Sequence, residues 1–191
     1  MKLTNIFSRL LAVFGFLLIF GVSGWGANGL IGQYYNNNSY TGSPAYTQID
    51  PTINFNWGTG SPTSINNDNF SIIWTGYIYI PETANYTFYA AHDDVMVVTI
   101  GGTEVYNNTT WTGGSNKYNN FSMNNLASGY YPIQIKFIEW SGGAYAEFAW
   151  KNNASITSQT IVPSSNLFTG IAPPVISNTT QIGRASCRER V

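Results

Sequence analysis

One alternating stretch, residues 70–80, limits the fold of this chain more than any other part of its sequence. Its large aliphatic and indole side chains share one face of an extended strand: Ile72, Trp74, Ile78 and Ile80. Tyr77 and Tyr79 fall on the opposite face. A period of two is typical of a strand that lays one face on a hydrophobic core. No long stretch follows the 3.6-residue period of an amphipathic helix.

Further extended segments repeat this pattern along the chain. Residues 86–90 follow a turn at 81–84, and residues 95–100 form an apolar run that ends at two glycines. Residues 131–140 and 144–150 alternate again. Many short strands with polar turns between them predict an all-β domain of antiparallel sheets, as a sandwich or a barrel. We expect its core to contain the large aromatic side chains Trp74, Phe88, Phe137, Phe148 and Trp150.

The N-terminal residues 1–26 have the composition of a secretory signal peptide. Lys2 and Arg9 supply positive charge, residues 10–20 are apolar, and Gly24 and Gly26 suit a cleavage site. A retained membrane anchor is the alternative, but the apolar stretch is shorter than the roughly 20 residues that a spanning helix needs. We therefore expect a secreted or cell-surface protein whose mature domain does not insert into a membrane.

The C-terminal residues differ in composition from the rest of the chain. Residues 182–191 contain three arginines and the only cysteine, Cys187. We interpret this string as the translation of a sequencing adapter, with a basic tail as the alternative. Pro173 and Pro174 make residues 170–181 a predicted linker to a missing downstream region. Residues 27–169 are then a single domain.

The charge of that domain excludes one class of partner. Without residues 1–26 and 182–191, three lysines and eight carboxylates remain, so the net charge is −5 rather than the −1 of the whole chain. Nucleic-acid binding needs a basic surface, so we expect no nucleic-acid partner. The domain also lacks cysteine, so no disulfide stabilises it. The sequence does not specify an oligomeric state.

Asp93 and Asp94 are adjacent, at the point where one predicted strand ends and the next begins. Two such charges repel by roughly 1 kcal/mol in water and by more in a drier site. Calcium, which prefers oxygen ligands, would compensate them. The alternative is a turn in which both side chains are solvated. The neighbouring His92, the only histidine, is expected to be an ordinary strand-end residue.

Several ordered segments of the chain resemble one known family. They are residues 29–35, 50–58, 69–77, 81–88 and 131–135. Together with Asp93–Asp94 and the later Glu139 and Gly142–Ala144, they are similar to the domain named after the anthrax protective antigen, the PA14 domain. The resemblance covers residues 29–169. It implies a β-sandwich.

The resemblance also implies a site. Lectin members of the family bind glycans through a calcium ion, held by two consecutive aspartates that a cis peptide joins. These aspartates correspond to Asp93 and Asp94. A second loop supplies further ligands, which correspond to the Glu139 side chain and the main-chain carbonyls of Ser141 and Gly143. Flocculins have asparagine where this chain has Glu139, whose carboxylate would either strengthen cation binding or pair with a lysine.

Carbohydrate binding is therefore the expected function. Asp93 and Asp94 would accept hydrogen bonds from a glycan or polysaccharide, and Trp140 and Trp111 would stack on its sugar rings. The alternative is a structural, adhesion or protein-interaction module of the same fold that binds no sugar. We do not expect an enzyme, although Asp93, Asp94, Glu139 and Glu147 could in principle form a glycosidase pair.

Overall fold

The structure, a computed structural model, describes residues 26–109 and 118–170. Most of the predicted signal peptide, residues 1–25, lies outside the described residues. So do residues 171–191, which include nearly all of the predicted linker and the whole adapter-like string. Trp111 also lies outside them.

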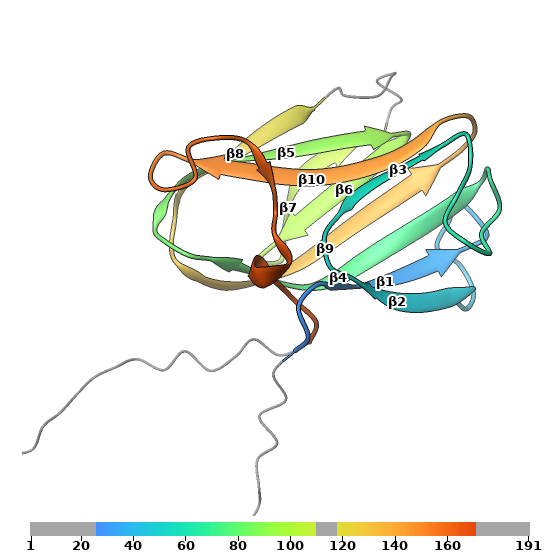
Figure 1. Cartoon of the computed structure of the whole chain (residues 1–191), viewed down its shortest axis with the longest axis horizontal. Helices are drawn as coiled ribbons and strands as arrows, with labels where there is room; N and C mark the ends of the chain where they lie inside the picture. The colour runs from blue at the N-terminus through green and yellow to red at the C-terminus, as the bar shows by residue number, and fades with distance from the viewer. Residues whose placement is uncertain (1–25, 110–117, 171–191) are drawn as a thin grey trace, which may run out of the picture.

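Two antiparallel sheets face each other (Figure 1). The seven-stranded sheet has the order β2 (Tyr46–Asp50), β1 (Leu30–Tyr35), β4 (Phe70–Ile80), β9 (Gly129–Glu139), β6 (Val95–Ile100) and β7 (Thr103–Asn108), and β12 (Leu167–Phe168) pairs with β4. The five-stranded sheet has the order β11 (Thr160–Ile161), β10 (Ala144–Asn152), β5 (Ala84–Asp93) and β8 (Asn119–Leu126), and β3 (Asn54–Gly58) pairs with β10. A short 3₁₀ helix, η1 (Ser164–Asn166), precedes β12. The predicted all-β fold is confirmed, and it is a sandwich.

The alternation in the sequence places these strands correctly. β4 has the predicted bounds, and its predicted inward residues Ile72, Trp74, Ile78 and Ile80 are fully buried. β4 pairs along its whole length with β9, where Ile133, Ile135 and Phe137 are buried between less buried neighbours. These two long strands form the centre of the larger sheet. In both strands, the alternate side chains that the sequence pattern placed inward are the buried ones.

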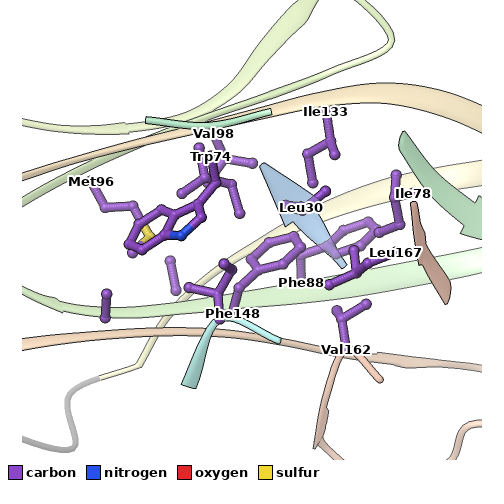
Figure 2. Packing of buried hydrophobic residues seen from close by; sticks show 14 of the residues in the cluster. Leu30, Trp74, Ile78, Phe88, Met96, Val98, Ile133, Phe148, Val162 and Leu167 are labelled. Atoms are coloured by element: carbon purple, nitrogen blue, oxygen red, sulfur yellow. The ribbon is translucent and has the colours of Figure 1, made fainter. Parts of the chain in front are cut away.

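The core fills the space between the sheets (Figure 2). Trp74 from β4 faces Phe148 of the opposite sheet, and Phe88 lies beside Phe148 with nearly parallel rings whose centroids are 5.7 Å apart. All five aromatic residues expected in the core are at most 1% exposed. Each buries enough apolar area to contribute several kcal/mol to stability.

A buried carboxylate that the sequence analysis did not single out ties the larger sheet to this core. Asp50 Oδ2 accepts hydrogen bonds from the Tyr34 hydroxyl at 2.6 Å and from Trp74 Nε1 at 2.7 Å. Its Oδ1 accepts one from Gln48 Nε2 at 2.7 Å. Gly32 makes room for this group, because a Cβ there would lie 2.3 Å from Asp50 Oδ2. A buried charge with three donors is satisfied, so Asp50 has a structural role.

The first and last described segments lie side by side at one place on the sandwich (Figure 1). The Gly29 N–H donates to the Leu167 carbonyl at 2.8 Å, and the Thr169 N–H donates to the Ala27 carbonyl at 2.9 Å. Within residues 26–109 and 118–170, no helix has the length and apolar character needed to cross a membrane.

Phe148→Ala should lower the free energy of unfolding by about 3–5 kcal/mol, because it leaves a cavity between the two sheets. Urea denaturation followed by tryptophan fluorescence measures the change. Ile49→Ala is the matched control, since Ile49 is 48% exposed and its truncation should cost less than about 0.5 kcal/mol. Equal losses in the two variants would contradict the described core.

Candidate functional site

The chain crosses from one sheet to the other at Asp94. Asp93 is the last residue of β5 and pairs with Tyr145 in the smaller sheet. Val95 is the first residue of β6 and pairs with Ile138 in the larger sheet. The peptide bond between Asp93 and Asp94 is cis, as the family resemblance implied. The predicted strand junction is therefore also a junction between the two layers.

Asp94 is held by neighbours from both sides of this crossing. Its side chain is 5% exposed, and Oδ2 accepts a hydrogen bond of 2.7 Å from the Trp140 main-chain N–H. Its own N–H donates to the Ile138 carbonyl at 3.2 Å. The alternative of a turn with both aspartates in water is therefore wrong for Asp94. Asp93 is half-buried.

His92 is a buried strand residue that fixes the Asp94 main chain. Its Nδ1 lies 3.0 Å from the Asp94 carbonyl oxygen, and its Nε2 lies 2.8 Å from the Tyr106 hydroxyl. Because a carbonyl oxygen only accepts, Nδ1 carries the proton and donates it. Burial lowers the pKa of His92, and the bond to the Asp94 carbonyl and the Asp94 charge partly offset that effect. A neutral imidazole with both nitrogens engaged agrees with the expected strand-end role.

Glu139 ends β9 and is fully buried, opposite Phe70 of β4. Neither carboxylate oxygen has a hydrogen-bond partner among the described residues. Burial, followed by the charges of Asp94, Asp93 and Asp68, raises the pKa of Glu139 to about 8. The alternative of a lysine partner has no support in Lys136 or Lys151, whose ammonium groups lie over tyrosine rings instead.

A surface hollow of about 490 Å³ lies against the aspartate pair. Its lining consists of Asp93, Asp94, Trp140, Ser141, Gly142 and Gly143. The sequence analysis had placed all of these except Gly142 at the site, and the structure brings them together. Trp140 is 39% exposed, so its ring is accessible. Glu139 does not line the hollow, because it lies buried beside it.

Asp68 belongs to this region, although the sequence analysis missed it. Its Oδ1 accepts a hydrogen bond of 3.1 Å from the Gly142 N–H, and the neighbouring Asn69 N–H donates to the Trp140 carbonyl at 3.1 Å. Gly142 has a φ of 101°, which favours glycine. The antiparallel pairing of β4 with β9 places Asp68 near the loop after Glu139. Pairing the two longest predicted strands could have found it.

The donor set of the hollow suits a hard cation, with one restriction. No three His, Cys, Asp or Glu side chains in the described part of the chain are grouped closely enough to hold a metal ion. A cation here therefore needs the two aspartates, main-chain carbonyls and water, which are ligands that calcium accepts. Glu139 adds little negative charge to this site near neutral pH, because its raised pKa of about 8 keeps the buried carboxyl mostly protonated.

A larger hollow, of about 550 Å³, lies apart from the aspartates. Phe55 and Trp57 of β3 form one wall, with their rings stacked at 5.0 Å, and Tyr34 and Tyr46 form another. None of the described residues expected to bind calcium or sugar lines it. Any ligand of the aspartate pair would therefore bind in the hollow of about 490 Å³ and not in this one.

The model of one protein family, the PA14 domain, matches residues 26–162. This chain belongs to the PA14 domain family. The crossing at Asp93–Asp94 and the loop from Glu139 to Gly143 both lie within the matched residues.

Relatives of this PA14 domain include proteins named as anti-sigma factors. The curated anti-sigma-I factor RsgI3 of Acetivibrio thermocellus is 30% identical over 147 residues, which are 76% of this chain and 22% of that protein. A solved anti-sigma factor domain-containing protein is 30% identical with a TM-score of 0.67, over 79% of this chain and 50% of that one. The chain thus spans about a fifth of the curated relative and half of the solved one.

A more distant solved structure shares the fold alone. The PA14 sugar-binding domain of an RTX adhesin is 15% identical, with a TM-score of 0.63 over 75% of this chain and 99% of that one. Near-complete coverage of that domain indicates that the two sandwiches have the same extent.

The raised pKa of Glu139 predicts an unusual pH dependence of stability without metal. The folded state keeps a proton that the unfolded state loses above its ordinary value of 4.5, so stability falls as the pH rises from there to about 8. As the pH rises, the unfolding free energy of the native chain minus that of Glu139→Gln should fall by up to about 1.4 kcal/mol per pH unit.

Urea denaturation in chelator between about pH 5 and pH 7 measures this difference, since both limits lie inside the titration window. The glutamine variant keeps the shape of the side chain and serves as the reference for every other titrating group. A difference that stays constant with pH would contradict the burial of Glu139.

Proposed function

We propose that this PA14 domain is a calcium-dependent carbohydrate-binding module. The observation that carries the proposal is the hollow in which Asp93, Asp94 and the exposed Trp140 ring meet. Carboxylates beside an accessible indole provide both an ion site and an apolar face for a sugar ring. The sugar-binding domain of the RTX adhesin, which has the same fold, is consistent with this proposal.

In the proposed complex, the Asp93 and Asp94 carboxylates and the carbonyls of Ser141 and Gly143 hold the calcium ion. Bound calcium supplies coordination positions for two neighbouring sugar hydroxyls. The aspartate oxygens accept hydrogen bonds from the same hydroxyls, and Trp140 packs on the apolar side of the ring. Millimolar affinity for one sugar corresponds to only about 4 kcal/mol, so useful binding would come from several copies.

We propose further that residues 27–169 act as an exported module of a larger protein. The predicted signal peptide supports export. The relative named as an anti-sigma factor, of which this chain spans 22%, supports a larger context. A module that binds carbohydrate outside the cell could report on polysaccharide in such a context, or attach the protein to a surface.

Calcium should bind the purified chain, and Asp94→Ala should weaken binding at least about tenfold, because it removes one of the two carboxylates. Isothermal titration calorimetry measures the affinity. Glu104→Gln is the matched control: it also removes one negative charge, but from the edge strand β7. If titration to millimolar calcium gives no heat of binding, the calcium proposal is wrong.

Trp140→Ala should weaken glycan binding roughly tenfold, a loss of about 1.4 kcal/mol, because it removes the stacking ring. Calcium affinity should change much less, since the variant keeps the main-chain N–H that donates to Asp94. Trp140→Phe, which retains an aromatic face, should recover most of the affinity. A glycan array followed by titration of the strongest ligand provides the measurement. Equal losses in the two variants would argue against stacking.

An interaction module without sugar binding is the second candidate. The 30% identity to an anti-sigma factor favours it, because that name indicates a regulatory protein rather than a lectin. The double variant Asp93→Ala, Asp94→Ala separates the two functions. Unchanged glycan-array and cell-binding signals would favour the interaction module, whereas their loss favours the lectin.

A further inference from the structure

A second hollow adjoins the aspartate site. It has a volume of about 280 Å³ and lies where β3 ends and β10 begins. Asn56, Gly58, Thr59 and Tyr145 line it, together with Asp93 and Gly143. The last two residues also line the first hollow. The two hollows therefore meet at Asp93 and Gly143.

Gly143 keeps this junction open. A Cβ built on it would lie 3.5 Å from Asp93 Oδ2 and 3.8 Å from the Gly58 carbonyl oxygen, so a side chain would project between the two walls. The backbone of Gly143 does not require glycine, since it is not among the residues with positive φ, unlike its neighbour Gly142. The missing side chain thus provides space rather than conformational freedom.

The lining of the second hollow combines polar side chains with apolar surface. Side chains of β3 alternate, so Phe55 and Trp57 line the larger aromatic hollow while Asn56 and Gly58 line this one. Asn56 Oδ1 accepts a hydrogen bond of 3.0 Å from the Gly58 N–H, which fixes the orientation of its amide. No lysine or arginine among residues 26–109 and 118–170 lines either hollow. Such mixed walls suit a neutral sugar ring, which has polar hydroxyl groups and an apolar face.

We propose that the two hollows are consecutive subsites, so that the domain binds a neutral oligosaccharide of at least two rings. One ring occupies the aspartate hollow and the next lies over Gly143 against Asn56 and Thr59. This inference rests on the proposed function for the first ring. It adds Asn56, Thr59 and Gly143 as residues that select for chain length and linkage.

Binding of matched short and long sugars tests the subsites. The probes are glucose with cellotetraose, xylose with xylotetraose, and galactose with Galβ1-3GlcNAc, titrated by calorimetry into the full chain at millimolar calcium. At least one longer sugar should bind roughly tenfold more tightly than its monosaccharide, because it gains the contacts of the second hollow.

Two variants locate that gain. Gly143→Ala inserts a methyl group at the junction at ordinary contact distances, so the fold should tolerate it. Asn56→Ala removes the amide from the second hollow. Both should reduce the ratio of the two affinities to less than about threefold. Asn54→Ala is the matched control: it truncates an exposed asparagine of β3 that lines neither hollow, and the ratio should persist.

The outcomes separate this inference from the proposed function. Monosaccharide and oligosaccharide affinities that are equal, or a ratio that survives in both variants, would overturn the second subsite alone. Calcium binding without binding of any sugar, short or long, would overturn the proposed function and the subsite with it.

Discussion

The crossing of the chain between layers at Asp94 is the constraint on which the site depends. β5 pairs within the smaller sheet up to Asp93, and β6 pairs within the larger sheet from Val95 onward. A single residue therefore connects two sheets that otherwise face each other across a hydrophobic core. The loops after β3 and β9 end at the same side of the sandwich (Figure 1). Main-chain bonds from Trp140 and Ile138 hold the crossing in place. The carboxylates thus converge because the topology brings both sheets to one point.

This convergence places several carboxyl groups close together, so Asp94, Asp93 and Asp68 disfavour a charge on Glu139. Glu139 is fully buried next to Asp94, and no donor in the described residues satisfies it. A protonated Glu139 removes the charge at low pH, and a cation in the adjacent hollow would counter it at high pH. A cation bound as proposed would therefore relieve the same repulsion as the proton, and its binding would then be linked to the stability of the fold.

The sequence was sufficient for whatever depends on local pattern. Alternation in residues 70–80 gave the bounds of β4, and the ordered segments that resemble the PA14 domain, with the Asp93–Asp94 pair, led to the correct family. It was insufficient for what depends on pairing across long separations. Asp50 is satisfied by Tyr34 and Trp74, which are 16 and 24 residues away, and Asp68 bonds a loop 74 residues later. The burial of Glu139 and the hollows beside Gly143 likewise arise only when the two sheets pack against each other.

The pairing of the two described ends has a mechanical consequence. Main-chain hydrogen bonds join Ala27 to Thr169 and Gly29 to Leu167. A force that pulls the two ends apart would break these few bonds one after another. The long β4–β9 pairing and the crossing at Asp94 lie off that line of force. Tension between the two described ends would therefore act on these terminal hydrogen bonds before it reached the hollow at the aspartate pair.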